Sequence, residues 1–217
     1  MTYTSNFVIG LTGNIGAGKS TVARIAEGLG ARIIDSDRTV RNLLACDTDL
    51  ALEIEHKFGS GVMRNGWPDR SSLARVVFND AGALRRLEDL IFPRVARQTT
   101  KQLAQPTRSP ATLIEAIKVI EGPTGKLLDA LWLVVSTVDL QISRAATSGR
   151  ISENEAKRRL AMQSATTEKE RLFKILRPGR PIWKIDNRSS EADLVKRVAT
   201  TWNETLSAVG QAENSVS

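Results

Sequence analysis

The chain has 217 residues, a length that allows one domain with an inserted lobe or two small domains, and 41% of them are hydrophobic, as is usual for a globular protein. Its single cysteine excludes an internal disulfide. No apolar stretch approaches the ~20 residues of a membrane-spanning helix and no basic region precedes an apolar segment, so we expect a cytoplasmic protein without signal peptide or membrane contact. The net charge is +7, but no Lys/Arg run of five occurs and one Tyr and five Phe offer few stacking rings, which favours a small polyanion over nucleic acid as the primary ligand.

The first predicted elements are a strand, a glycine-rich loop and a helix. The apolar run Phe7–Thr12 predicts a buried strand, and the residues from Thr21 on repeat apolar side chains at helical spacing. Between them, Gly13 to Ser20 fit G-x-x-x-x-G-K-[ST], the phosphate-binding loop or P-loop. Its N–H groups surround phosphate oxygens, its lysine reaches the β- and γ-phosphates, and its serine hydroxyl binds Mg²⁺. The loop predicts ATP and Mg²⁺ as ligands, with Ser20 on the metal. The predicted nucleotide-binding residues are Gly13, Asn14, Ile15, Gly16, Ala17, Gly18, Lys19, Ser20 and Thr21.

A second strand is predicted at Ala31–Ile34, and two acidic residues follow it. Asp35 and Asp37 come at the carboxyl end of this strand, the edge of an open α/β sheet that faces the ligand. A carboxylate there can take the proton of an attacking hydroxyl or hold Mg²⁺ through water. The spacing leaves a second interpretation equally open, in which Asp37 only caps the next helix.

The stretch from 38 to 105 is predicted to contain helices and loops but no strand. A turn-rich loop is expected at 61–69. The predicted helices lie around 40–44, at 48–58, at 71–78 and from 80 on. We interpret the stretch as a helical lobe, about 38–106, inserted between two strands.

Strands and helices alternate in the rest of the chain. The predicted strands are 112–120, 131–135 and 182–185. The predicted helices are 138–147, 152–164 and 191–206. This alternation predicts an α/β fold with a doubly wound parallel sheet, in a single domain over 1–210 whose core is about 6–37 and 108–207. The small polar tail 211–217 is expected to be disordered.

Several sequence blocks follow one another in a fixed order. They are Gly10–Thr21, Leu29–Asp37, Gly66–Ala74, Leu87–Pro93, Ile114–Gly122, Gln141–Arg144, Arg159–Gln163 and Ile185–Asn187. In this order they resemble the motifs of the dephospho-coenzyme A kinase family, and the resemblance covers about residues 7–205. The P-loop alone would indicate only a nucleoside triphosphatase or kinase, so it is the ordered set that points to this family.

The resemblance implies ATP-dependent phosphorylation of the ribose 3′-hydroxyl of dephospho-CoA, which gives coenzyme A and ADP and ends CoA biosynthesis. It implies a P-loop kinase fold, a helical lid over about 144–163 and a helical insertion that binds the acceptor. We expect a monomer or weak homo-oligomer. By position, Asp37 becomes the base, Lys19 and Arg144 further catalytic residues, and Asn187 a neighbour of the adenine. The implied substrate-binding residues are Asp35, Asp37, Arg70 and Glu121.

Three positions depart from the family pattern. Phe92 stands where histidine is usual, Ser148 where a lid arginine is usual, and Ile117–Lys118 where a proline-leucine pair is common. A lid arginine stabilises charge on the transferring phosphoryl group, and we expect Arg144, helped by Arg150, to supply that charge. Two alternatives stay open: another P-loop kinase with a nucleoside or nucleotide acceptor, and a catalytically weak ATP-binding module that acts through partners.

Overall fold

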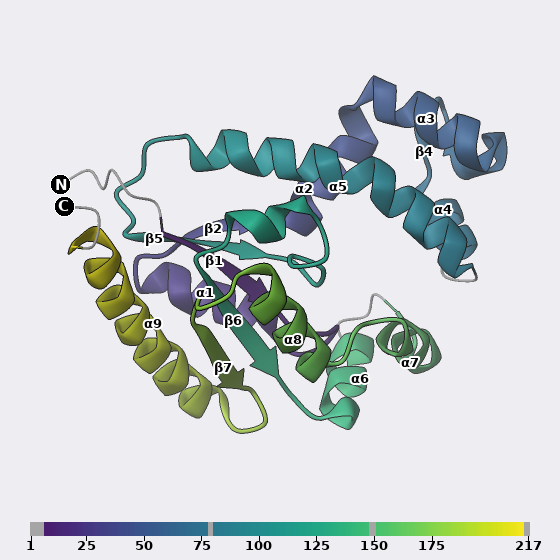
Figure 1. Ribbon diagram of the computed structural model, residues 1–217. Helices are drawn as coiled ribbons and strands as arrows, with labels where there is room; N and C mark the ends of the chain where they lie inside the picture. Colours follow the sequence, from purple (N-terminus) through teal and green to yellow (C-terminus); the bar gives the residue numbers. More distant parts are fainter. Residues whose placement is uncertain (1–6, 78–79, 148–150, 215–217) are drawn as a thin grey trace. The chain divides into compact units, whose positions relative to one another are not determined.

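The structure is a computed structural model that describes residues 7–77, 80–147 and 151–214 (Figure 1). The chain divides into two compact units. The core unit comprises the residues up to Ile34 and those from Leu103 on, and the helical unit is Asp35–Gln102. Within the described residues, no helix is both long and apolar enough to cross a membrane.

A five-stranded sheet forms the centre of the core unit, in the order β2-β5-β1-β6-β7. Its strands are β1 (Phe7–Thr12), β2 (Arg32–Asp35), β5 (Ala111–Glu115), β6 (Ala130–Val135) and β7 (Ile182–Asp186). β1 pairs in parallel with both β5 and β6, and β7 pairs in parallel with β6. Because β1 is central, it is buried along its whole length. The predicted doubly wound parallel sheet is confirmed.

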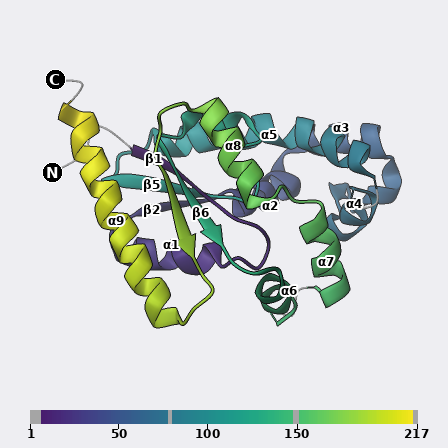
Figure 2. The same ribbon diagram turned by 60° about the horizontal axis from the view of Figure 1, so that its bottom comes forward.

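Helices cover both faces of this sheet (Figure 2). On one face, Ile9 of β1 belongs to an apolar cluster with Val22 of α1 (Lys19–Gly28) and Val198 of α9 (Glu191–Asn214). On the other face, Val8 clusters with Phe173 of α8 (Thr166–Leu176) and with the segment around η2 (Pro123–Leu127). Successive β1 side chains therefore point to opposite faces, as strand geometry requires. The two remaining helices, α6 (Val138–Thr147) and α7 (Glu153–Ala161), pack against each other.

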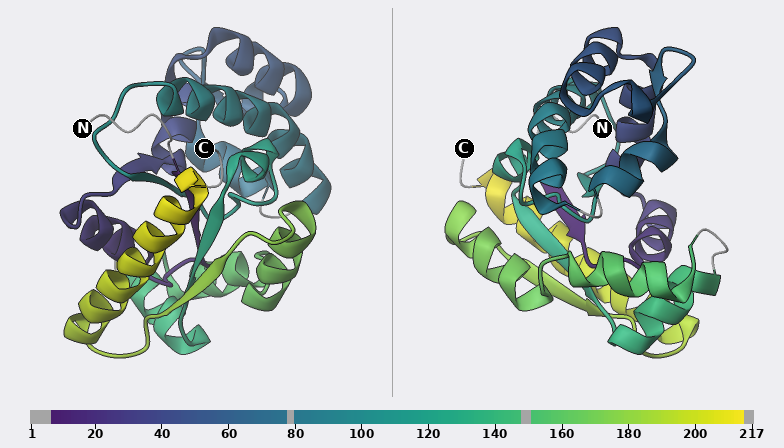
Figure 3. Two further views of the ribbon diagram at one scale, coloured as in Figure 1. Left: turned by 60° about the vertical axis from the view of Figure 1, so that its left-hand side comes forward. Right: turned by 90° about the vertical axis from the view of Figure 1, so that its right-hand side faces the viewer.

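The helical unit, coloured blue to teal in Figure 3, has its own apolar core. Leu50, Ile54, Leu73, Leu87 and Ile91 lie in this core. Its elements are α2 (Ser36–Cys46), α3 (Thr48–Phe58), η1 (Ser60–Val62), β3 (Met63–Arg64), β4 (Trp67–Pro68), α4 (Arg70–Val77) and α5 (Ala81–Leu103), whose last residue belongs to the core unit. The stretch predicted to lack strands thus contains an antiparallel hairpin of β3 and β4. Its turn holds Asn65 at φ 52° and Gly66 at φ 80°, the backbone that an Asn-Gly hairpin turn adopts.

Two elements of the core unit are shorter than predicted. The strand predicted at 112–120 ends at Glu115, because the chain leaves the sheet and the carbonyl of Ile117 accepts hydrogen bonds from Thr12 Oγ1 (2.8 Å) and Lys169 Nζ (2.7 Å). The helix predicted at 152–164 ends at Ala161.

At the end of the chain, α9 continues to Asn214, so the tail predicted to be disordered from 211 on begins as helix. Buried Val209 extends the apolar spacing of the helix and holds its last turns on the core. Residues 215–217 lie outside the described residues.

Sequence reasoning also missed α8, whose composition is rich in charged residues. Pairs of opposite charge three or four residues apart, such as Glu168 with Arg171 and Glu170 with Lys174, support its exposed side. Its inward side buries Phe173 and Lys169 completely. A buried lysine breaks the apolar stripe by which an amphipathic helix is recognised.

Candidate functional site

The P-loop joins β1 to α1 and is shaped by close neighbours from other parts of the core unit. Gly16 has φ 71° and Gly18 has φ 96°, left-handed values that glycine adopts without strain. A Cβ atom on Gly16 would lie 2.0 Å from the carbonyl oxygen of Gln141, and one on Gly18 would lie 2.1 Å from Asn187 Nδ2. Both glycines are therefore required by packing as well as by backbone conformation.

Lys19 is the first residue of α1, and its side chain is buried in the loop with 8% exposure. Its Nζ donates hydrogen bonds to the carbonyl oxygens of Gly13 (3.0 Å) and Asn14 (3.2 Å). The N–H of Ala17 in turn donates to the same Asn14 carbonyl (3.1 Å). The loop is thus closed around its own cation at the positive end of a helix dipole, the arrangement that binds phosphate groups.

Ser20 and Glu115 place two side-chain oxygen atoms next to each other beside the P-loop. Ser20 Oγ donates a 2.8 Å hydrogen bond to Glu115 Oε1. Glu115 ends β5 and is paired in register with Leu11 of β1, one residue before that strand ends. A serine hydroxyl and a carboxylate are hard oxygen donors, which suit Mg²⁺. Glu115 was not predicted as a site residue, although its position as an acidic residue that closes an apolar strand could have indicated it.

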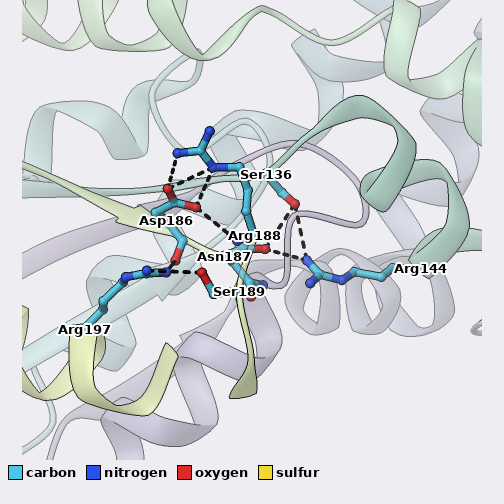
Figure 4. A network of polar contacts seen from close by, with 7 residues as sticks. All are labelled: Ser136, Arg144, Asp186, Asn187, Arg188, Ser189 and Arg197. Carbon is cyan, nitrogen blue, oxygen red and sulfur yellow. Dashed lines mark hydrogen bonds and ion pairs between the residues drawn. The ribbon is translucent and has the colours of Figure 1, made fainter. Parts of the chain in front are cut away.

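Figure 4 shows a network of arginines that fixes the loop after β7. Arg144 Nη1 donates to the carbonyl oxygen of Asn187 (3.0 Å) and to Ser136 Oγ (3.3 Å), and Arg197 Nη1 donates to the carbonyl oxygen of Asp186 (2.7 Å). Hydrogen bonds from the Arg188 guanidinium hold the pKa of the Asp186 carboxyl below its ordinary value. The Asp186 carboxylate and the Arg188 guanidinium of this loop are therefore paired with each other.

Asn187 connects this rigid loop to the P-loop. Its side chain is buried, and Nδ2 donates a 2.8 Å hydrogen bond to the carbonyl oxygen of Ala17. Its main-chain N–H donates to the carbonyl oxygen of Val135 at the end of β6 (2.9 Å). The structure thus brings Asn187 and Arg144 to the P-loop, where the side-chain amide of Asn187 faces loop backbone. An adenine contact of Asn187 stays a prediction.

Glu121, predicted to bind substrate, lies in a buried ion pair. Its Oε1 atom is 3.1 Å from Nζ of Lys169, whose side chain is completely buried. Its other carboxylate oxygen is buried and accepts no hydrogen bond from the part of the chain that the structure describes. The pair fixes the segment that follows β5.

Asp35 is the last residue of β2, and Asp37 lies in the first turn of the helix that follows, α2. Asp35 is the N-cap of α2: its Oδ1 accepts from the N–H of Arg38 (2.9 Å), and its Oδ2 is 3.3 Å from Arg41 Nη2. Asp37 is exposed in the first turn of the same helix. The interpretation of Asp37 as the helix cap was therefore wrong, because Asp35 has that role.

Arg70 is the first residue of α4 and is exposed. The preceding Asp69 holds the start of this helix, because its Oδ2 accepts from the N–H of Ser72 (2.8 Å). Hydrogen bonds from the Ser71 and Ser72 side chains and the Ser72 N–H lower the pKa of Asp69 to about 2. Phe92 is half-buried in α5. Ser148 and Arg150 lie outside the described residues, so the lid arginine stays a prediction.

The fold and the loop together define the class of the protein. A P-loop between the central strand of a parallel sheet and its first helix, with an acidic residue at the end of the neighbouring strand, is the arrangement of P-loop kinases. A crystal structure from Thermus thermophilus is similar to the chain with a TM-score of 0.76 and 25% identity, over 94% of this chain and 99% of that one. A dephospho-CoA kinase from Campylobacter jejuni shares the fold, with a TM-score of 0.60 and 22% identity over 93% of this chain and 98% of that one.

Sequence comparison gives the particular family. The family model of dephospho-CoA kinase matches residues 7–176. The dephospho-CoA kinase of Geobacter metallireducens is 36% identical over 202 residues, which are 92% of this chain and 96% of that relative. The chain belongs to the dephospho-CoA kinase family, whose members are kinases that use ATP and a hydroxyl acceptor.

Proposed function

We propose that the P-loop, Ser20 and Glu115 hold MgATP while the protein transfers the γ-phosphoryl group to the ribose 3′-hydroxyl of dephospho-CoA. This reaction gives coenzyme A and ADP, the last step of CoA biosynthesis. The observation that carries the proposal is the Ser20–Glu115 contact of 2.8 Å beside a closed P-loop. A bound Mg²⁺ would neutralise charge that develops on the β- and γ-phosphates. The two oxygen ligands are already adjacent, so the residues present fit the metal.

In this proposal Lys19 binds the β- and γ-phosphates and Asp37 accepts the proton of the acceptor hydroxyl. Two observations support Asp37. Asp35 already caps α2, so the Asp37 carboxylate is not needed for that purpose, and Asp37 is exposed. Asp35, Arg70 and Glu121 are proposed to help hold the acceptor, with the helical unit providing most of its contacts.

Arg144 and Asn187 are proposed to serve the nucleotide. Arg144 uses Nη1 for its contacts with Asn187 and Ser136, and no described residue accepts a hydrogen bond from its other guanidinium nitrogens. A guanidinium fixed at one nitrogen can present the others to a phosphoryl group or a base. We further propose that the protein works in the cytoplasm as a monomer or weak homo-oligomer.

The direct test is ATP consumption with and without dephospho-CoA, followed by ³¹P NMR to locate the new phosphate. We expect turnover that depends on dephospho-CoA and a 3′-phosphate in the product. Lys19→Ala is the control, expected to stay folded and lose about a hundredfold or more in turnover, the scale of one preorganised charge contact. Equal rates with AMP as acceptor would favour another nucleotide kinase, and ATP binding without turnover would favour a binding module.

The metal site has its own test in Glu115→Gln. This change keeps the shape of the side chain and an oxygen for Ser20 but removes the negative charge. We expect the Mg²⁺ concentration at half-maximal activity to rise about tenfold or more, the effect expected for a metal ligand or its immediate partner. An unchanged Mg²⁺ dependence would exclude Glu115 from the metal site.

A further inference from the structure

A side chain from the connection between α7 and α8 reaches the P-loop. Oε1 of Gln163 accepts a 2.8 Å hydrogen bond from the main-chain N–H of Ile15, although the two residues are 148 positions apart. Both residues belong to the core unit, and both are partly buried. The hydrogen bond thus joins two segments that are distant in sequence but belong to one compact unit.

The position of Gln163 is fixed by neighbouring structure. Its N–H donates to the carbonyl oxygen of Leu160 (3.1 Å) at the end of α7. The start of α7 is held by Ser152, whose side chain accepts from the N–H of Glu155 (3.2 Å), and Glu155 also pairs with Arg159 (2.8 Å). A helix stabilised at its start and along its surface provides a firm base for the side chain that follows it.

The hydrogen bond also determines how the Gln163 amide is oriented. A backbone N–H must be met by an acceptor, so the oxygen of the side-chain amide faces Ile15. The nitrogen Nε2, which carries two N–H donors, therefore points away from the Ile15 N–H. No described residue accepts a hydrogen bond from Nε2.

The contact lies at the end of the loop where the terminal phosphate is expected. Lys19 Nζ donates to the carbonyl oxygen of Asn14 (3.2 Å), and this carbonyl shares one peptide unit with the N–H of Ile15. Because a P-loop lysine reaches the β- and γ-phosphates, this peptide marks the same end of the bound nucleotide. A neutral amide donor beside a phosphate cradle favours phosphate oxygens, whereas a carboxylate there would repel them.

We propose that Gln163 is a phosphate-binding residue of the kinase reaction. Oε1 stays on the N–H of Ile15, and Nε2 donates a hydrogen bond to the terminal phosphoryl group of ATP. The connection between α7 and α8 thereby contacts the phosphoryl group that is transferred. This inference rests on the proposed function, since it assigns a ligand to the same P-loop.

Two substitutions distinguish phosphate binding from a purely structural tie. Gln163→Glu keeps an acceptor for the N–H of Ile15 but places a negative charge where Nε2 was. Gln163→Met keeps the length of the side chain and loses both polar atoms. We expect kcat/KM for ATP to fall about tenfold in Gln163→Met, which loses one hydrogen bond to a charged group, and about a hundredfold in Gln163→Glu, which loses the same bond and adds repulsion between carboxylate and phosphate. A purely structural tie predicts the opposite order, because only Gln163→Met breaks the bond to Ile15.

Affinity measurements complete the test. By calorimetry, Gln163→Glu should weaken binding of ATP more than binding of ADP, because only ATP carries the terminal phosphate. Gln105→Glu is the matched control: Gln105 Oε1 also accepts a hydrogen bond, from Arg32 Nη2 (3.3 Å), and the side chain is exposed, so its variant should match the parent.

A loss in Gln163→Glu no larger than that in Gln163→Met, or equal weakening of ATP and ADP, would overturn the inference. If the parent binds ATP without phosphorylating dephospho-CoA, the proposed function fails, while the two affinities still decide the role of Gln163.

Discussion

Gly18→Ala would place a methyl group where the P-loop and the loop after β7 meet. The new Cβ atom would lie 2.1 Å from Asn187 Nδ2, on a backbone with φ 96°. Left-handed backbone costs a residue other than glycine about 1–2 kcal/mol. To remove the collision, Asn187 must give up its buried hydrogen bond to the carbonyl of Ala17, which costs about 1–3 kcal/mol more. We therefore expect the free energy of unfolding to fall by about 2–5 kcal/mol, the sum of these two costs.

A double-mutant cycle separates the two costs. Asn187→Ala alone removes the hydrogen bond to Ala17 and should cost about 1–3 kcal/mol. In that background Gly18→Ala meets no collision and should cost only the backbone strain of about 1–2 kcal/mol. The two substitutions together should thus cost less than the sum of their separate effects by about 1–3 kcal/mol, the hydrogen bond that would otherwise be counted twice.

The assay is urea unfolding of the parent, the two single variants and the double variant. Gly28→Ala is the control, because Gly28 lies in α1 with open space where its Cβ would be, and alanine there should not destabilise the protein. If the effects of Gly18→Ala and Asn187→Ala add within about 0.5 kcal/mol, Asn187 does not limit the residue at 18 and the packing argument is wrong.

Two further predictions concern charges in the core unit. Lys169→Met leaves the Glu121 carboxylate without its buried partner and should lower the free energy of unfolding by about 3–5 kcal/mol, with much of the loss recovered when Glu121 is changed to glutamine as well. Urea unfolding measures both variants, and equal losses in the single and double variants would contradict the ion-pair argument. Arg188 lowers the pKa of Asp186 in the folded protein. The ionised Asp186 carboxylate therefore stabilises the fold at pH values above 3.8, the ordinary pKa of aspartate, and this stabilisation is lost as the pH falls through the lower, folded-state pKa. Asp186→Asn should therefore lower the unfolding temperature at neutral pH but not in strong acid, and an equal difference at both would refute the pKa argument.

The parts of the fold that could be predicted from sequence are those that depend on local pattern. β1 and β6 are continuous apolar runs, α3 has Asp47 as its cap and Gly59 at its end, and the P-loop is a contiguous motif. Each was predicted within a residue of its observed bounds. Local signals were sufficient because the residues that determine these elements lie within the elements or directly beside them.

The parts that sequence could not give depend on contacts between distant segments. Glu115 becomes a partner of Ser20 only because β5 lies beside β1, a strand order that the sequence does not state. Lys169 is buried only because the segment after β5 supplies a carbonyl and a carboxylate for its Nζ. Asp35, and not Asp37, caps α2 because the helix begins at Ser36, directly after β2. These contacts could not be predicted because the sequence does not state the order and register of the strands.

Two separate physical requirements therefore favour glycine at the same positions of the P-loop. Phosphate binding requires backbone N–H groups to point inward, and the neighbouring carbonyl of Gln141 and amide of Asn187 leave no room for side chains at Gly16 and Gly18. Hydrogen bonds from Asn187 to Ala17 and from Ile15 to Gln163 tie the loop to distant segments of the core unit. A loop held by such contacts loses less conformational entropy when a ligand binds, so more of the contact energy is available to stabilise the transferring phosphoryl group. The distant segments that hold the loop thus contribute to catalysis, and we expect substitutions in them to lower turnover although the P-loop sequence is unchanged.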